Sequence, residues 1–313
     1  MIKRKFLSWL ILNRERRSKM TGRFRFVTAA VLALMAIGAR APAASEEEGI
    51  IRIGGSTTLL PIIATIADNY MKRYPTWDKV DPSLPKKGVV IYVSGGGSGG
   101  GVKSTINGTF DIGLVSRDLS DKERELLGRH QTFLVGKDAV AFVVNKANPL
   151  VKVRESFDKT ELAAILSGEK KTYKDIDGRL PNSSIVLFVR DSSAGSAEIV
   201  QEKIMGKQQI APDALQVPSQ GTLLKKLETS RLAFGYISSG LALGSKQLRT
   251  FAFEGIKPLN QRIASGDYTL ARPLLLLVKG EVRPVVQRFI DHVLTEGQRE
   301  VERNSYVPAK GAK

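Results

Sequence analysis

A glycine-rich stretch at residues 94–103 follows a strand-like run at 89–93 and leads into a helix-like segment at 102–106. Glycines at a strand-to-helix junction let backbone N–H groups crowd around a small anion, and the start of the helix adds partial positive charge. Taken alone, such a stretch is usually a simple turn or a flexible linker. Its meaning therefore depends on the segments that surround it.

The whole chain alternates between strand-like and helix-like runs, which favours an α/β architecture with mostly parallel sheets flanked by helices. The strand-like runs are residues 50–53, 89–93, 111–115, 138–145, 185–189, 232–237 and 270–278. The helix-like runs are residues 61–73, 102–106, 121–129, 160–167, 197–205, 219–229 and 282–301. No internal repeat interrupts this alternation.

Hydroxyl-bearing and basic residues recur where strand-like runs end. They are Ser56-Thr57-Thr58, Ser98 among its glycines, Ser116-Arg117 and the segment 190–196. Ligands collect outside the carboxyl ends of strands in α/β folds, and arginine offers a fork of donors to an oxyanion. No nucleophile has a base beside it in these segments, so the pattern predicts anion binding. Each serine or threonine alone is also a normal helix cap, and each arginine alone a normal surface ion pair.

The first 44 residues are predicted to be a signal peptide. These residues include ten Lys and Arg against one acidic residue, a short apolar run lies at 26–39, and small residues follow at 41–45. An uncleaved membrane anchor is the alternative. Met20 stands where a signal peptide of ordinary length begins, so residues 1–19 are either an extension of the gene model or a longer charged region. Cleavage is expected between Ala43 and Ser45.

Composition limits the chemistry that the rest of the chain can perform. The sequence contains no cysteine, which removes disulfides, thiolate catalysis and the lipid-attachment cysteine of an anchored binding protein. Its two histidines are far apart, so we expect no metal centre and no Ser-His-Asp triad. Beyond residue 44 the net charge of +8 is spread along the chain. We therefore expect no nucleic-acid partner.

Seven motifs in order resemble those of the phosphate-binding proteins that serve ABC phosphate importers. The motifs are GSTTLLP at 55–61, SGGGSGGGV at 94–102, DIGLVSR at 111–117, ELAAILSG at 161–168 with KDI at 174–176, RDSSAGSAE at 190–198, FGYIS at 234–238, and the C-terminal segments 272–278 and 289–307. Together they cover residues 50–308, which is far more specific than any one of them.

The resemblance implies a type II-like periplasmic binding protein with two α/β lobes, each a mostly parallel sheet flanked by helices. Such lobes are joined by two crossings and close over one oxyanion by a hinge motion. Lobe one is expected at residues 46–143 plus 236–313, and lobe two at residues 144–235. The crossings are expected near residues 143–146 and 234–236.

The resemblance also implies a phosphate site, residue by residue. The expected contacts are Ser56, Thr57, Thr58, Ser98, Ser116, Arg117, Arg190, Ala194, Gly195 and Ser196. Ala194 stands where the family usually has a serine, so one hydroxyl is missing. Another branch of the family has an aspartate near residue 116 that accepts the phosphate proton, and its absence here puts discrimination against sulfate in doubt. Asp118 is a possible substitute, Asp111 is expected to be structural, and Asp191 is expected to support an arginine.

The sequence thus predicts an exported, monomeric binding protein, free in the periplasm, that captures inorganic phosphate for a membrane ABC permease complex. We expect no cofactor and no catalytic activity. Three alternatives stay open: a binding protein for sulfate, molybdate, tungstate or arsenate, an exported phosphoester hydrolase, and a signalling or adhesive protein on the same fold.

Overall fold

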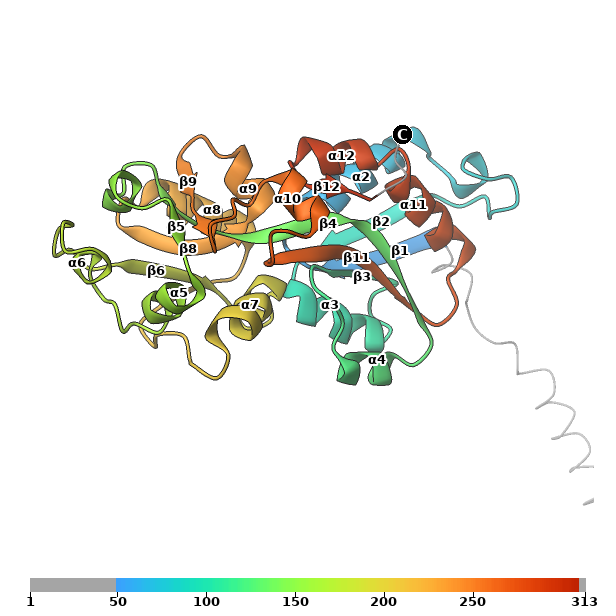
Figure 1. Ribbon diagram of the computed structural model, residues 1–313. Coiled ribbons are helices and arrows are strands. Elements are labelled where there is room, and N and C mark those ends of the chain that lie inside the picture. The colour runs from blue at the N-terminus through green and yellow to red at the C-terminus, as the bar shows by residue number, and fades with distance from the viewer. Residues whose placement is uncertain (1–48, 310–313) are drawn as a thin grey trace, which may run out of the picture. The chain divides into compact units, whose positions relative to one another are not determined.

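A computed structural model describes residues 49–309 of the chain, as two lobes built on one continuous mixed sheet (Figure 1). The predicted signal peptide and its possible start at Met20 lie outside the described residues. The strand order is β2-β1-β3-β11-β4-β8-β6-β7, and β12 and β9 pair with β4 outside this path. None of the helices within residues 49–309 has the length and apolar character needed to span a bilayer.

The first lobe contains the sheet strands at one end of this order. Its strands are β1 (Ile50–Gly55), β2 (Val90–Ser94), β3 (Ile112–Val115), β11 (Ala271–Lys279), β12 (Val307–Pro308) and the first part of β4 (His130–Asn145). Helices α2 (Leu60–Arg73), α11 (Pro284–Leu294) and α12 (Gln298–Arg303) share one buried hydrophobic cluster with this sheet. Helices α3 (Gly97–Ile106) and α4 (Asp121–Leu127) contribute to a second cluster with β3 and β11.

The second lobe repeats the arrangement around the other end of the sheet. Its strands are β6 (Val186–Arg190), β7 (Leu215–Val217), β8 (Ala233–Ser238), β9 (Leu248–Thr250), the small pair β5 (Ser156–Phe157) and β10 (Ala252–Phe253), and the last part of β4. Its helices are α5 (Lys159–Leu166), α6 (Tyr173–Ile176), α7 (Gly195–Val200), α8 (Gln220–Thr229), α9 (Ser239–Gly244) and α10 (Asn260–Ser265), and a π-helical turn, Gln201–Met205, follows α7. Short 3-10 turns lie at Trp77–Lys79 and Pro149–Lys152.

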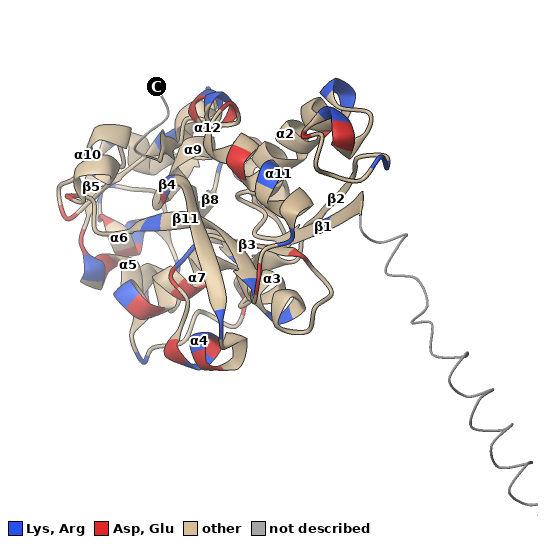
Figure 2. Cartoon of the chain, turned by 90° about the vertical axis from the view of Figure 1, so that its right-hand side faces the viewer, with Lys and Arg blue, Asp and Glu red and all other residues tan. Residues whose placement is uncertain are grey.

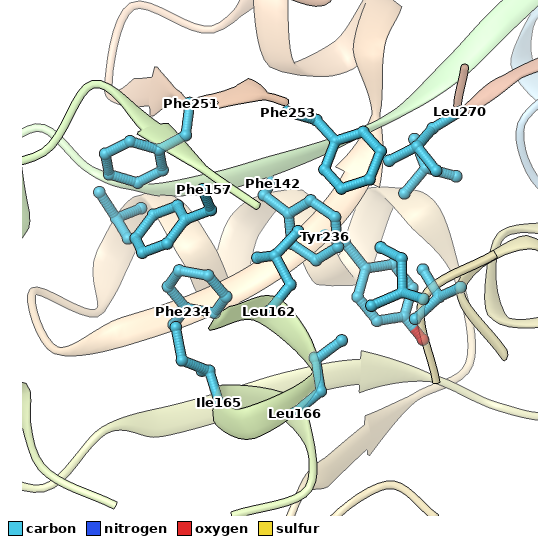
Figure 3. Packing of buried hydrophobic residues seen from close by; sticks show 14 of the residues in the cluster. Phe142, Phe157, Leu162, Ile165, Leu166, Phe234, Tyr236, Phe251, Phe253 and Leu270 are labelled. Carbon is cyan, nitrogen blue, oxygen red and sulfur yellow. The ribbon is translucent and has the colours of Figure 1, made fainter. Parts of the chain in front are cut away.

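The core of the second lobe is rich in aromatic rings (Figure 3). Phe157 packs edge-on against Phe234 and Phe251, with ring centroids 5.7 and 5.0 Å apart. Edge-to-face pairs of this kind are favoured over parallel sandwiches because of the ring quadrupole. Phe253 and Leu270 belong to the same cluster, so a segment that follows β8 in the sequence still packs in the second lobe.

The sheet is parallel at its two ends and antiparallel in its middle. Strand β1 pairs in parallel with β2 and β3, and β6 pairs in parallel with β7 and β8. In contrast, β4 and β11 pair antiparallel with each other, and β4 also pairs antiparallel with β8. The expectation of mostly parallel sheets therefore describes only the outer strands.

Strand β4 runs from one lobe into the other (Figure 1). It pairs with β11 as far as Ala139 and with β8 from Val140 onward. The amide of Val140 donates to the carbonyl oxygen of Leu270 at 3.1 Å, so the chain returns beside β4 at this point. From this pairing we propose crossings at residues 138–140 and 270–272, beside the expectation of 143–146 and 234–236 from the resemblance.

The predicted helix at residues 282–301 is two helices, α11 and α12. The chain leaves the helical path at Thr295, whose hydroxyl donates to the carbonyl oxygen of Asp291 at 2.7 Å. Threonine and glycine are weak helix formers, and Gly297 follows two residues later. The helical spacing of apolar residues continues across these two residues, so the sequence pattern predicts one helix although the backbone forms two.

Candidate functional site

A small cavity lies between the two lobes, outside the carboxyl ends of β1, β3 and β6. The empty space between its wall atoms is about 140 Å³, so the cavity is small and tightly enclosed by its lining side chains. The residues that line it are Ser56, Thr57, Thr58, Gly97, Ser98, Ser116, Arg190, Ala194, Gly195, Ser196 and Arg272. Nine of the ten sequence-predicted contacts are therefore brought together, and Arg117 is not among them.

The turn after β1 aims its hydroxyls at the cavity. The amide of Ser56 donates to the carbonyl oxygen of Leu114 at 2.8 Å, which ties the turn to the end of β3. The Ser56 hydroxyl oxygen accepts from the amide of Thr58 at 3.2 Å, just before α2 begins. Ser56 thus orders this turn and lines the cavity at the same time, so the structural and ligand-binding interpretations of this serine are compatible.

The glycine loop brings Ser98 against the end of β3. Helix α3 begins at Gly97, within the glycines, rather than at residue 102 as predicted. A Cβ on Gly101 would lie 2.7 Å from the carbonyl oxygen of Leu114, so this position needs glycine for α3 to approach the sheet. The hydroxyl oxygen of Ser98 accepts from the amide of Ser116 at 3.0 Å and lies 3.1 Å from the Ser116 hydroxyl.

Arg190 at the end of β6 is buried and held on several sides. Its Nε donates to the carbonyl oxygen of Val217 at 2.9 Å, and Nη2 donates to that of Pro218 at 3.0 Å and to Asp191 at 3.1 Å. Nη1 reaches across to the hydroxyl of Thr57 at 3.2 Å. Burial lowers the pKa of Arg190, and the positive charge of Arg272 lowers it further, while Asp191 opposes both. An anion in the cavity would relieve this unfavourable field.

Arg272 lines the cavity from the first residues of β11, and it was not among the contacts expected from the sequence. Its Nη2 lies 2.7 Å from the Asp138 carboxylate and 3.1 Å from the hydroxyl of Thr58. Its Nη1 lies 3.2 Å from the hydroxyl of Ser116. The signal was present, because Arg272 and Asp138 each place one charge in an otherwise apolar strand-like run. The energetic cost of burying an unpaired charge is prohibitive. A charged residue in a buried strand therefore predicts a partner of opposite charge.

Asp138 is saturated by its partners within the protein. Beside Arg272, it accepts from the hydroxyls of Ser238 at 3.0 Å and Ser239 at 2.9 Å. Its carboxylate is fully buried, like the guanidinium that it pairs with, and it does not line the cavity. The pair therefore fixes Arg272 at the crossing between the lobes, with the remaining donors of the guanidinium directed toward the hydroxyls of the first lobe.

The cavity is lined by groups that donate hydrogen bonds. Oxygens of Thr57, Thr58 and Ser116 already accept from Arg190 or Arg272, and those of Ser56 and Ser98 accept from backbone amides. A hydroxyl that accepts in this way keeps one hydrogen that it can donate to a ligand. Two guanidinium groups line the cavity and no carboxylate does. This arrangement is suited to a small anion with several acceptor oxygens.

Arg117 lies outside the cavity, in a cluster with two glutamates. Its Nη1 and Nη2 each donate to Glu123 at 2.8 Å, and its Nε pairs with Glu198. Burial acts to lower the pKa of Arg117, but the bond to Glu123 and the charge of Glu198 outweigh it, so the pKa is raised.

Three aspartates beside the motifs do not line the cavity. Asp111 accepts from the amide of Arg52 at 2.7 Å and pairs with Arg283 at 2.8 Å, as its expected structural role requires. Asp118 is absent from the cavity wall. Asp191 pairs with Arg190, in agreement with the support that we expected it to give. Within residues 49–309, no group of three or more His, Cys, Asp or Glu side chains is arranged to hold a metal ion.

The comparisons with known proteins agree with this fold. Residues 41–296 match the model of the PBP superfamily domain, so the chain belongs to the PBP superfamily, which is a family of substrate-binding proteins. The curated phosphate-binding protein PstS of Borreliella burgdorferi is 29% identical over 277 residues, covering 85% of this chain and 92% of the relative. The PstS of Staphylococcus haemolyticus is 26% identical, covering 81% of this chain and 79% of the relative. The crystal structure of an ABC-type phosphate transport receptor from Vibrio cholerae is 25% identical with a TM-score of 0.64, covering 83% of this chain and 100% of that one.

Proposed function

We propose that this protein captures inorganic phosphate in the cavity between its lobes and delivers it to a membrane ABC importer. The observation that carries the proposal is the pair of buried arginines, Arg190 and Arg272, that converge from two lobes on a cavity lined by hydroxyl donors. A divalent oxyanion needs this density of donors when it leaves water. The relatives named PstS and the phosphate transport receptor from Vibrio cholerae support phosphate as the cargo.

In the proposed site, phosphate oxygens accept from the hydroxyls of the turn after β1, from Ser98 and Ser116, and from the two arginines. The loop before α7 adds the hydroxyl of Ser196 and backbone groups of Ala194 and Gly195. Arg117 is not part of this proposed set because it lies in the cluster with Glu123 and Glu198. Bonds between charged partners are about twice as strong as neutral ones, so the arginines carry most of the binding energy.

We further propose that the protein acts outside the cytoplasmic membrane as a free monomer. The sequence signals of residues 1–44 and the absence of cysteine, the residue that carries a lipid anchor, support this location. Binding and delivery need no covalent chemistry, and no residue in the cavity wall provides a nucleophile with a base beside it.

A second cargo is favoured by one observation. No carboxylate lines the cavity to accept the hydrogen of a protonated phosphate, so a fully deprotonated oxyanion such as sulfate is also suited to it. Molybdate, tungstate and arsenate are further candidates of the same shape.

Calorimetric titration of the anion-stripped protein, beginning at Ser45, tests the proposal. Phosphate should bind one to one and more tightly than sulfate, arsenate, molybdate and tungstate. A clear preference for one of the other anions would keep the site and change the cargo. Absence of heat and of thermal stabilisation with all five anions would refute the proposal.

A further inference from the structure

Contacts within the first lobe alone fix the side chain of Arg117. It lies on the loop after β3, and its two terminal nitrogens donate to the two carboxylate oxygens of Glu123 on α4, each at 2.8 Å. Nη1 also donates to the carbonyl oxygen of Asp118 at 2.9 Å. A guanidinium that is held at both ends of its fork has little freedom left. Its Nε is therefore buried at a defined place.

The partner of that Nε comes from the other lobe. Glu198 on α7 forms an ion pair with it. The same helix begins at Gly195, next to the cavity-lining Ala194, so one rigid element carries both the anion-side loop and Glu198. Movement of α7 toward an anion in the cavity therefore brings Glu198 to Arg117.

The lobes also touch beside this ion pair. The amide of Gly99 in α3 donates to the carbonyl oxygen of Ser193, which precedes α7, at 3.0 Å. A Cβ on Gly97 would lie 2.5 Å from the hydroxyl of Ser193, and the φ angle of Gly97 is +76°. Helices α3 and α7 face each other here in Figure 1. The structure thus has closed lobes at this side of the cavity.

Closure brings two carboxylates, one from each lobe, onto a single guanidinium. The side chain of Arg117 is 7% exposed, that of Glu123 18% and that of Glu198 38%, so water screens the three charges only in part. Without Arg117, the same closure would place two negative charges together. Juxtaposed like charges at an interface strongly oppose its formation.

We propose that Arg117 is a positioning residue that holds the lobes closed by neutralising Glu123 and Glu198, and is not a ligand of the anion. This inference rests on the proposed anion capture, because the closed state is the state that retains the anion. Loss of Arg117 opens the lobes through repulsion between the two glutamates, and removal of one glutamate charge cancels that repulsion. A direct ligand would show no such dependence on Glu198.

Stopped-flow phosphate release from four proteins tests the inference: wild type, Arg117→Gln, Glu198→Gln and the double variant. Arg117→Gln should release phosphate at least about tenfold faster, and the double variant should return to within about threefold of wild type. Glu202→Gln is the matched control, because Glu202 is an exposed glutamate on the π-helical turn after α7. A double variant that releases phosphate as fast as Arg117→Gln, or faster, would overturn the inference.

A measurement of closure separates this inference from the proposed function. The sequence has no cysteine, so Lys86→Cys and Lys207→Cys, at exposed positions of the first and second lobes, give two unique sites for a dye pair. The distance between the dyes should increase in Arg117→Gln, with or without anion. It should return to the wild-type value in the double variant that also carries Glu198→Gln. A wild type that binds no oxyanion refutes the proposed function alone. A dye distance that Arg117→Gln leaves unchanged, or that Glu198→Gln does not restore, overturns the role of Arg117.

Discussion

The guanidinium of Arg272 lies 2.7 Å from the carboxylate of Asp138, and both side chains are fully buried where the chain crosses between the lobes. The same guanidinium reaches the hydroxyls of Thr58 and Ser116 in the cavity wall. One ion pair therefore joins the crossing strands to the candidate anion site. A change in the charge of either partner should affect stability and binding in different ways.

Asp138→Asn should destabilise the free protein and preserve anion binding. Removing one partner of a buried ion pair costs about 3–5 kcal/mol, because the other charge is left uncompensated. An anion in the cavity supplies negative charge to Arg272, so the gain in thermal stability on adding phosphate should be larger than in wild type. Chemical unfolding with and without phosphate measures both effects. Asp267→Asn, at an exposed ion pair with Arg262, is the control and should change neither.

Arg190→Gln should weaken phosphate binding by about 100-fold, since a hydrogen bond to a charged group contributes about 1.5–3 kcal/mol. The substitution keeps a polar side chain of similar length beside the carbonyl oxygens of Val217 and Pro218, so the fold should persist. Calorimetry measures the affinity, and circular dichroism checks the fold. Arg179→Gln removes an exposed arginine and should bind as wild type does. Normal binding by Arg190→Gln would show that the anion lies elsewhere.

Ala194→Ser should tighten phosphate binding. Ala194 is buried in the cavity wall and is the N-cap residue of α7, without a side chain that can cap the helix. One added hydrogen bond contributes about 0.5–1.5 kcal/mol, which corresponds to a three- to tenfold gain in affinity. The dissociation constant measures this, and a higher melting temperature without anion would report the added cap. Unchanged binding by the serine variant would mean that the anion does not approach this loop.

Sulfate should compete with phosphate, because the cavity wall has no carboxylate to accept the hydrogen of a protonated phosphate. A donor left without an acceptor costs about 1–3 kcal/mol, which lowers the affinity for phosphate relative to sulfate by about 5- to 160-fold. Displacement calorimetry at neutral pH gives this ratio. Exclusion of sulfate at millimolar concentrations would indicate an acceptor that the cavity wall acquires when the anion binds.

Phosphate binding should take up protons at Glu198 in mildly acidic solution. Burial raises the pKa of this carboxyl above its ordinary value of 4.5, against the opposing charge of Arg117, and the nearby Glu123 raises it further. When the lobes are open, the Glu198 carboxyl is solvated and has its ordinary pKa. Closure therefore becomes more favourable as pH falls from the raised pKa toward 4.5. Above the raised pKa, protonation of Glu198 no longer contributes to closure. Calorimetry at pH 5 in two buffers of different ionisation enthalpy measures the uptake. Subtracting the uptake of Glu198→Gln removes the contribution of phosphate itself, and an equal uptake in both proteins would contradict the prediction.

Most of the residues that line the cavity could be predicted from the sequence. They follow strands with a clear hydrophobic pattern, and their motifs occur in the same order as in a known family. Arg117 was expected to contact the anion but lies outside the cavity wall, because a motif identifies a residue without showing the direction of its side chain. Its guanidinium is held by Glu123, six residues further along the chain, and by Glu198 in the other lobe, and neither glutamate belongs to the motif at 111–117. Arg272 and Asp138 were overlooked because each is one charge in an apolar run, and only pairing between distant strands brings them together.

The pairing of the central strands also could not be predicted from the sequence. Alternation of strands and helices predicts parallel neighbours, but β4 runs from one lobe into the other and pairs antiparallel with β11 and β8. Nothing in the period of a buried strand reports its direction or its partner.

The most direct test of the account is a crystal structure of the protein with arsenate, whose arsenic atom is located by anomalous scattering. The account predicts one strong peak in the cavity, with anion oxygens within hydrogen-bond distance of Arg190, Arg272 and the hydroxyls of Ser56 and Ser98. Arg117 should remain paired with Glu123 and Glu198. A peak against the guanidinium of Arg117, or a cavity without arsenic in a crystal that holds it elsewhere, would contradict the account.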